Sequence, residues 1–230
     1  MTTTLITGAN KGLGYETARR LIEAGHTVWI GARDAERGQK AADELGASFV
    51  QLDVTSQESV DAAVTTVTAA GGLDVLVNNA GITGPHRDAA DLEAADFEEV
   101  YAVNVFGAAR MIRAFLPTLQ ESAAPTVVNV TSGLGSFAEV HDTSRVESTV
   151  IAPTYCSSKS ALTMMTVQYA KALPWLRINA ADPGYTATDL NGNSGHQTVT
   201  EGTDAIVGLA TAGVDGESGK FVDRNGVAPF

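Results

Sequence analysis

Cysteine and basic residues are scarce in this sequence. The single cysteine, Cys156, excludes an internal disulfide bond, so we expect a reducing, cytoplasmic location. The 15 Lys and Arg residues are outnumbered by 27 Asp and Glu residues, which gives a net charge of −12. Because this charge repels phosphate backbones and anionic lipids, we expect neither nucleic acid nor a membrane as a partner.

Long apolar stretches and clustered metal ligands are missing as well. No run is long enough to span a bilayer, and Met1 leads directly into a strand-like segment without a basic and then apolar leader. We therefore expect a protein that is neither secreted nor membrane-spanning. The four histidines are scattered, and no carboxylate or thiol spacing groups them, so we expect no metal site.

The dominant pattern is an alternation of short β-branched apolar runs with longer helical patterns. Apolar residues make up 44% of the 230 residues, which suits one domain with a substantial core. The alternation predicts an α/β fold: a single-domain, doubly wound parallel sheet of the Rossmann type over residues 1–230, with helices on both faces. The expected strands are residues 3–7, 27–32, 48–53, 74–78, 126–131, 177–181 and 220–222.

Helices are predicted from apolar spacing and from their end signals. Between the first two strands we expect a helix that ends at Gly25, and the next, residues 35–45, is capped by Asp34 and stopped by Gly46. Thr55 with Glu58 resembles a capping box for a third. Two longer helices are expected at residues 97–119, ending near a proline at 117, and at residues 155–173.

Two polar, irregular segments, 133–153 and 185–199, follow strand ends. Ligands of a doubly wound sheet lie beyond the carboxyl ends of its strands, so these segments are candidate walls of a substrate site. Segment 133–153 also holds several apolar residues, among them Phe137 and Ile151. These predict contact with the substrate pocket or with another subunit, or packing within the segment itself.

A glycine-rich run, TGANKGLG at residues 7–14, joins the first strand to the first helix. Glycines allow close approach to a pyrophosphate, whose charge the N–H groups at a helix start can meet. Three glycines after a strand are also typical of a plain turn. The following helix and second strand favour a dinucleotide site. The expected cofactor contacts in this run are Gly8, Asn10, Lys11, Gly12, Leu13 and Gly14.

The end of the second strand indicates which dinucleotide is bound. Arg33 stands where an NAD enzyme would have an acidic residue, and its guanidinium suits a 2′-phosphate. Lys11 would add a second cation near the same ribose. In the alternative interpretation Asp34 binds the ribose and both cations are ordinary surface charges, but Asp34 serves better as a helix cap. The sequence thus predicts NADP rather than NAD.

The third and fourth strands end in further candidate contacts. Asp53-Val54 ends the third, where the aspartate could accept a hydrogen bond from an adenine amino group or could simply cap a turn. Asn78-Asn79-Ala80-Gly81 ends the fourth. Its small residues let the backbone lie against a cofactor while the asparagines lock the loop, although a simple turn is the alternative.

Tyr155 and Lys159 are four residues apart at the start of a predicted helix, so they share one face. Carbonyl reduction needs a hydride on carbon and a proton on oxygen, and a free tyrosine exchanges protons reluctantly near neutrality. A neighbouring ammonium would lower its pKa. Ser132, at the end of the fifth strand, could orient the substrate oxygen. Taken alone, such a pair is usually only a helix face.

Taken together, the motifs resemble those of the short-chain dehydrogenase/reductase family along the whole chain. They are TGANKGLG at 7–14, Asp53-Val54, NNAG at 78–81, Asn104 in VNV at 103–105, Ser132 in NVTSG, YCSSK at 155–159 and PGYTATDL at 183–190. The resemblance implies Tyr155 as general acid/base, with Ser132 as substrate orienter. It implies that Lys159 holds the nicotinamide ribose and tunes Tyr155, and that Asn104 anchors a relay water. The implied cofactor contacts are Asp53, Val54, Asn79, Ala80, Gly81, Tyr155, Lys159, Pro183, Gly184, Thr186 and Thr188.

Lys11 with Arg33 resembles the NADPH-using carbonyl reductase branch, as does the extended stretch between Ser132 and Tyr155. This implies hydride transfer between NADP(H) and a small to medium carbonyl compound or secondary alcohol, and a homodimer or homotetramer as the assembly. The alternatives are a non-catalytic, dinucleotide-binding redox sensor and a methyltransferase on a similar fold. Neither has a use for the intact Tyr155 and Lys159 pair.

Overall fold

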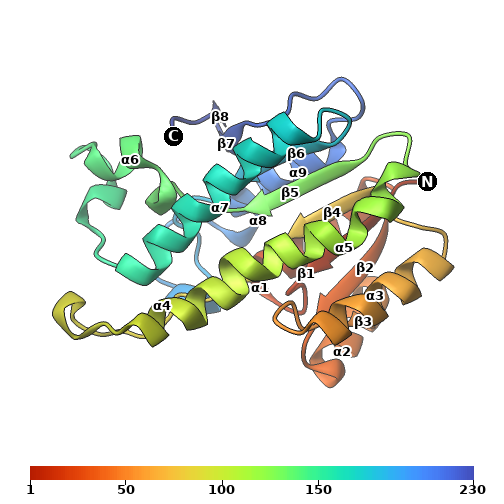
Figure 1. Cartoon of the computed structure of the whole chain (residues 1–230), viewed down its shortest axis with the longest axis horizontal. Helices are drawn as coiled ribbons and strands as arrows, with labels where there is room; N and C mark the ends of the chain where they lie inside the picture. The colour runs from red at the N-terminus through yellow and green to blue at the C-terminus, as the bar shows by residue number, and fades with distance from the viewer.

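Eight strands form one sheet in the order β3-β2-β1-β4-β5-β6-β7-β8 in the computed structural model, which describes residues 1–230 (Figure 1). All neighbours are parallel except β7 and β8. The strand order reverses between β1 and β4, which is where ligands bind in such sheets. The strands are β1 (Thr3–Thr7), β2 (Thr27–Ala32), β3 (Ser48–Gln51), β4 (Val75–Asn78), β5 (Thr126–Val130), β6 (Arg177–Ala181), β7 (Phe221–Asp223) and β8 (Gly226–Val227).

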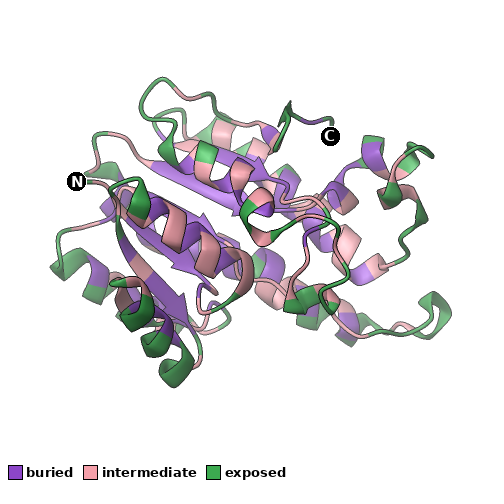
Figure 2. Cartoon of the chain, turned by 180° about the vertical axis from the view of Figure 1, so that it is seen from behind, coloured by how far each residue is buried: buried purple, intermediate pink, exposed green.

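Helices cover both faces of this sheet, because neighbouring residues of the buried strands point to opposite sides. In β1, Leu5 belongs to a core cluster with α3 and α5, whereas Ile6 belongs to one with α1, α2 and α9. Figure 2 shows the buried sheet between helices with exposed outer faces. The helices are α1 (Gly12–Glu23), α2 (Ala35–Leu45), α3 (Gln57–Ala69), α4 (Ala94–Tyr101), α5 (Ala108–Gln120), α6 (Phe137–His141), α7 (Pro153–Ala172), α8 (Val199–Gly202) and α9 (Asp204–Thr211). None is both long and apolar enough to cross a membrane.

The expected helix ends are largely confirmed. Gly25 and Gly46 have φ values of +87° and +67°, and the Asp34 side chain accepts a hydrogen bond of 2.9 Å from the Arg37 N–H at the start of α2. The expected cap of α3 is wrong by one residue. Ser56, not its predecessor, is the N-cap, because the chain first makes a turn around the Asp53 carboxylate.

The long helix expected at residues 97–119 is interrupted and extends past the proline. A π-helical segment, Ala102–Gly107, joins α4 to α5. Pro117 lies inside α5, which continues to Gln120, one residue past the expected end at residue 119. The buried side chains of Met111, Phe115 and Leu119 keep α5 on the sheet and outweigh the hydrogen bond that proline cannot make.

Segment 133–153 is less irregular than its sequence suggests. It contains short 3₁₀ turns at Gly133–Gly135 and Val146–Thr149 in addition to α6, and Figure 1 shows this region projecting from the rest of the molecule. Its apolar residues are not covered by its own packing, since Phe137 is 70% and Ile151 85% exposed. We therefore still expect a substrate or a second subunit to cover these apolar residues.

Candidate active site

The glycine-rich loop between β1 and α1 has the backbone shape of an anion cradle. Gly8 and Gly12 have φ values of +64° and +56°, which residues with side chains rarely adopt. A Cβ atom on Gly8 would lie 3.0 Å from the Cα of Ala80, so two loops touch here. Lys11 is the N-cap of α1 but makes no side-chain capping bond. The first N–H groups of α1 therefore fit the pyrophosphate of a dinucleotide.

Asparagine and threonine side chains lock the loop after β4 against this cradle. The Asn79 Nδ2 donates to the carbonyl oxygens of Thr7 at 2.8 Å and Gly8 at 3.2 Å. The Thr7 hydroxyl accepts from the N–H groups of Asn79 and Ala80. The locking role expected of the asparagines is thus confirmed for Asn79, and Thr7 shares it.

Gly81 brings this loop into contact with the expected catalytic residues. A Cβ atom at Gly81 would lie 3.3 Å from the Asn104 Oδ1 and 3.5 Å from the Lys159 Nζ. A side chain here would therefore crowd both groups, which explains why the loop ends in glycine.

Asn104 lies inside the π-helical segment and is fully buried. Its Oδ1 accepts from the Ile82 N–H at 2.9 Å, and its Nδ2 donates to the Ile82 carbonyl at 2.9 Å and to the Ser158 hydroxyl at 3.0 Å. The wider π turn places the amide among these partners, as π-bulges often do at functional sites. The π turn makes the predicted helix irregular at Asn104.

Ser132, Tyr155 and Lys159 come together at the carboxyl end of β5. Tyr155 and Lys159 share one face of α7, with the Lys159 Nζ 5.5 Å from the centre of the Tyr155 ring. The Nζ also donates a hydrogen bond of 2.9 Å to the Val130 carbonyl. The Ser132 hydroxyl lies near enough to that of Tyr155 to lower its pKa, and it accepts a hydrogen bond of 3.2 Å from the Leu134 N–H. The structure thus assembles the predicted trio, with two hydroxyl groups side by side.

Burial sets the pKa values of this pair in the structure. It raises the pKa of Tyr155, the nearby Asp182 raises it further, and the nearby Ser132 hydroxyl opposes both effects. Burial also lowers the pKa of Lys159 to about 8, against the opposing charge of Asp182. The lysine-lowered tyrosine pKa expected from the sequence is not seen here, because the loss of hydration on burial dominates the shift.

Tight packing holds the turn after Ser132 against α7. A Cβ atom at Gly135 would lie 2.7 Å from backbone atoms of Lys159 and Ser160, closer than a side chain allows. The Ser160 hydroxyl donates to the Gly135 carbonyl at 2.8 Å. A glycine two residues before the start of α6 therefore lets Ser132 reach the tyrosine.

At the adenosine end of the expected site, Arg33 is exposed directly after β2. Asp34 is occupied by Arg37, whose backbone N–H and Nε bind its two carboxylate oxygens at 2.9 and 2.8 Å. This favours its role as a helix cap over that of a ribose ligand. The Asp53 Oδ1 accepts from the Thr55 N–H and hydroxyl, so the turn role left open by the sequence is present.

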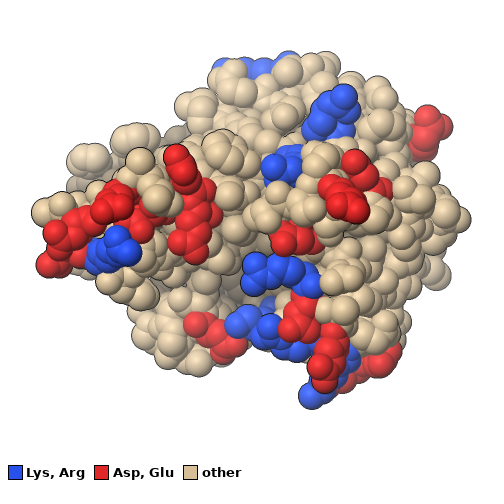
Figure 3. All heavy atoms as spheres, turned by 60° about the horizontal axis from the view of Figure 1, so that its bottom comes forward, with Lys and Arg blue, Asp and Glu red and all other residues tan.

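The position of Lys11 brings a contact that the sequence did not indicate. Its Nζ pairs with the exposed Asp189 carboxylate at 3.1 Å, which joins the cradle to segment 185–199. Thr188 of that segment faces Gly12. On the face of the molecule shown in Figure 3, Lys and Arg side chains gather below the centre, with Asp and Glu beside them.

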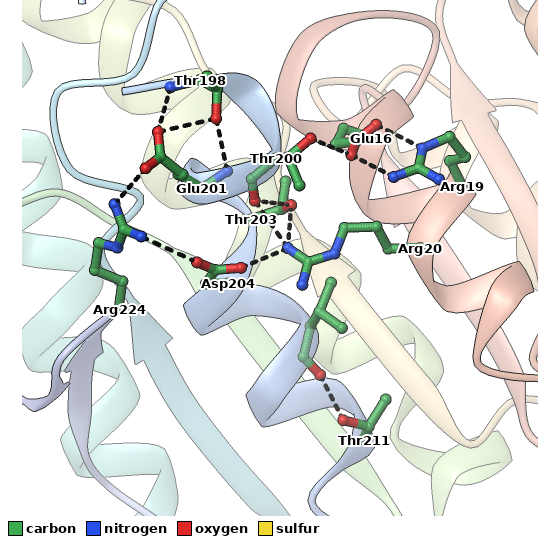
Figure 4. A network of polar contacts seen from close by, with 11 residues as sticks. Glu16, Arg19, Arg20, Thr198, Thr200, Glu201, Thr203, Asp204, Thr211 and Arg224 are labelled. Carbon is green, nitrogen blue, oxygen red and sulfur yellow. Dashed lines mark hydrogen bonds and ion pairs between the residues drawn. The ribbon is translucent and has the colours of Figure 1, made fainter. Parts of the chain in front are cut away.

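Segment 185–199 is a loop closed by its own hydrogen bonds. Gly184, at φ +65°, starts it, and the buried Thr186 donates its hydroxyl to the Pro183 carbonyl at 2.8 Å. Its far end runs into a polar network, shown in Figure 4, that ties α8 and α9 to α1. There the Arg20 Nη1 binds the Asp204 carboxylate at 2.8 Å. The loop is therefore anchored at both ends.

Sequence reasoning missed two buried acidic residues beside Ser132. Asp182 is 3% and Glu139 1% exposed, and a side chain at Gly133 would collide with the Glu139 carboxylate. An acidic residue at the end of a predicted strand and directly before Pro183-Gly184 was the available signal for Asp182. Glu139 gave none, because it lies in the unpatterned segment.

Comparison with known proteins agrees with this geometry. Residues 2–198 match the family model described as short chain dehydrogenase. Short-chain dehydrogenase/reductase 1 of Saponaria officinalis is 33% identical to this chain, and the match covers 98% of this chain and 95% of the relative. The (+)-neomenthol dehydrogenase of Capsicum annuum is 30% identical, and the match covers 98% of this chain and 96% of the relative. The NADPH-bound carbonyl reductase from chicken fatty liver matches 100% of this chain and 99% of its own with a TM-score of 0.88 and 27% identity. The chain belongs to the short-chain dehydrogenase/reductase family of oxidoreductases.

Proposed function

We propose that this protein is an NADP(H)-dependent reductase of small to medium carbonyl compounds, equally able to oxidise the corresponding secondary alcohols. The observation that carries the proposal is the convergence of Ser132, Tyr155 and Lys159 at the end of β5, with the Lys159 Nζ 5.5 Å from the centre of the tyrosine ring and bonded to the Val130 carbonyl. A redox sensor or a methyltransferase has no need for this arrangement.

The nicotinamide supplies or accepts the hydride when the dinucleotide is bound. Tyr155 then donates its hydroxyl proton to the substrate oxygen, which the Ser132 hydroxyl orients by a hydrogen bond. Lys159 holds the nicotinamide ribose and favours the phenolate that Tyr155 leaves behind. Asn104, bound to the α7 residue Ser158, positions a water through which the tyrosine is reprotonated.

The preference for NADP rests on Arg33, with Lys11 as a second cation. Arg33 is exposed after β2 and Asp34 is already held by Arg37, so a 2′-phosphate meets a guanidinium rather than a carboxylate. The NADPH in the structurally similar chicken carbonyl reductase supports this assignment. The remaining proposed cofactor contacts are Gly8, Asn10, Gly12, Leu13, Gly14, Asp53, Val54, Asn79, Ala80, Gly81, Pro183, Gly184, Thr186 and Thr188.

A moderately apolar ketone or aldehyde is the proposed substrate class. Exposed apolar side chains, including Phe137 and Tyr185, lie in the two segments that flank the site. The similar (+)-neomenthol dehydrogenase carries the name of a compact apolar alcohol, which supports this size and polarity.

The test follows NADPH consumption at its absorbance band with a panel of ketones, aldehydes and quinones. Tyr155→Phe should lower turnover at least about 100-fold while NADPH affinity changes little, because the hydroxyl acts on the proton. Tyr169→Phe, which removes a hydroxyl from the core-packed part of the same helix, is the matched control and should remain active. No NADPH consumption with any compound, or a Tyr155→Phe enzyme with more than a few per cent of the activity, would contradict the proposal.

A further inference from the structure

Asp182 lies at the end of β6, where its backbone is fixed in the sheet. Its N–H donates to the Val222 carbonyl of β7 at 2.8 Å, and its side chain is buried. The Oδ1 accepts a hydrogen bond of 2.9 Å from the Gly184 N–H. The Gly133 N–H faces this carboxyl group and favours its charged form, and a Cβ at Gly133 would lie 3.1 Å from the Oδ2.

These two N–H groups belong to different parts of the site. Gly133 directly follows Ser132, whose hydroxyl lies near that of Tyr155. Gly184 starts the loop proposed to contact the nicotinamide. One buried side chain therefore joins the turn that orients the substrate to the loop that holds the hydride carrier.

Burial raises the pKa of Asp182, whereas the hydrogen bond from Gly184 and the nearby Gly133 N–H favour its carboxylate form. Glu139 beside it receives no well-formed hydrogen bond on either oxygen, and burial together with the Asp182 charge raises its pKa to about 7. Of the two neighbouring carboxyl groups, Glu139 is therefore the one that takes up a proton first.

The Asp182 charge acts on the expected catalytic pair. The Lys159 Nζ bonds to the carbonyl of Val130, which pairs in the sheet with Ala181, the residue before Asp182. The Asp182 charge opposes the burial that lowers the pKa of Lys159 and adds to the burial that raises the pKa of Tyr155. The titratable and charged groups that face Asp182 are Tyr155 and Lys159 of α7, Glu139 of α6, Arg145 and Glu147 of the segment after it, and Asp223 of β7. Arg145 partly offsets the negative charge of the acidic residues among them, because its guanidinium lies 3.1 Å from the Glu139 carboxylate and 3.2 Å from that of Glu147.

We propose that Asp182 is a positioning residue. It holds the Ser132 turn and the Pro183-Gly184 loop in a fixed position relative to each other, and it serves as the counter-charge to the buried Lys159. This inference rests on the proposed function for its effect on catalysis. The bridge between the two loops stands on the Gly184 hydrogen bond and on the close approach of Gly133 to the same carboxyl group. Its two parts are therefore tested by different measurements.

Hydrogen exchange tests the bridge without any turnover. In Asp182→Ala, amide exchange in peptides covering residues 131–136 and 183–187 should become at least about tenfold faster than in the wild type, because both N–H groups lose the carboxyl group that they face. Asp182→Asn keeps one acceptor oxygen, so amide exchange should become faster in only one of the two peptides. Asp223→Asn makes the same chemical change on the neighbouring strand and should leave amide exchange in both peptides unchanged. Thermal unfolding checks that each variant is folded, and the nearly isosteric Asn variant carries the test if the Ala variant is not.

Kinetics test the positioning. Asp182→Ala should lower kcat at least about tenfold with less than a threefold change in the carbonyl KM, because misalignment affects the transition state more than binding. In Asp182→Asn, the decline of the reduction rate on the alkaline side should move to lower pH, because a negative charge beside Tyr155 and Lys159 has been removed. The Asp223→Asn profile should match that of the wild type.

The outcomes separate this inference from the proposed function. Wild-type exchange in both peptides of a folded Asp182→Ala or Asp182→Asn protein would overturn the bridge, whatever the activity. An unshifted pH profile in Asp182→Asn would overturn the counter-charge role. A wild-type enzyme without any carbonyl reductase activity would instead overturn the proposed function, while faster exchange would still establish the bridge.

Discussion

The Asn104 side chain donates a hydrogen bond of 3.0 Å to the Ser158 hydroxyl, which joins the π-helical segment to the helix that carries Tyr155 and Lys159. The same amide pairs with both backbone groups of Ile82, just after the loop that ends in Gly81. A single buried side chain thus connects three parts of the proposed site. Asparagine disfavours helix interiors, so its presence here reflects these partners and not helix propensity.

Asn104→Ala should lower both stability and activity. The substitution leaves the Ile82 N–H and carbonyl and the Ser158 hydroxyl without their partner, which should cost about 2 to 4 kcal/mol in the free energy of unfolding. Urea unfolding measures the loss. Ser158→Ala removes only one of the bonds and should cost about 1 kcal/mol. Equal stability of Asn104→Ala and the wild type would show that the amide does not hold the π turn.

Arg33→Ala should remove most of the preference for NADPH over NADH. We expect the wild type to prefer NADPH by about 10- to 100-fold, or 1.4 to 2.8 kcal/mol, and the variant to bind both dinucleotides similarly. Titration of each dinucleotide measures the ratio. Arg19→Ala is the control, because Arg19 pairs with Glu16 and Glu23 on the outer face of α1 and its loss removes the same charge. An unchanged ratio in Arg33→Ala would place the 2′-phosphate elsewhere.

Glu139→Gln should change how stability depends on pH. Burial and Asp182 raise the pKa of Glu139 from 4.5 to about 7, so the folded chain binds more protons than the unfolded chain between these values. The contribution of the Glu139 carboxyl group to the free energy of unfolding is therefore fully present below about pH 4.5 and is lost as the pH rises to about 7. As the pH rises from about 4.5 to about 7, the free energy of unfolding of Glu139→Gln should increase relative to that of the wild type by at most about 3 kcal/mol.

Chemical unfolding at pH 5 and pH 8 measures this change. Glu44→Gln offers a control, because Glu44 is an exposed residue of α2 on the far side of the sheet from this segment. The same stability difference between Glu139→Gln and the wild type at both pH values would be incompatible with a raised glutamate pKa.

Ile151→Ser should raise the carbonyl KM, or reorder the substrate panel, with little effect on NADPH affinity. Ile151 is 85% exposed and stands four residues before Tyr155, so an apolar substrate can cover it. A point change is preferable to deleting the segment, because deletion would remove the buried Glu139 and its partner Arg145. Val214→Ser, at an exposed apolar site beyond α9, should leave the kinetics unchanged. Altered oligomer size without altered kinetics would assign Ile151 to a subunit contact instead.

Local patterns in the sequence were enough to predict seven strands and the motifs at their ends. β-branched runs, left-handed glycines and the Asp34 cap depend on neighbours within a few residues, so they can be recognised without the fold. The wide spacing of Ser132 and Tyr155 in the sequence also fits, because Ser132 lies just beyond the carboxyl end of β5 and Tyr155 lies in the first turn of α7, and these two ends meet at one edge of the sheet.

The tertiary structure decided what depends on distant partners and on burial. The pairing of Lys11 with Asp189 spans 178 residues, and no local pattern distinguishes Asp189 from an ordinary surface carboxylate. Asp182 is adjacent to a predicted motif, yet it approaches Gly133 only because β5 and β6 lie side by side. The pKa of Tyr155 follows the same logic: the sequence placed a lysine near it, but the depth of burial in the folded chain set the direction of the shift, because hydration lost on folding depends on all the surrounding atoms at once.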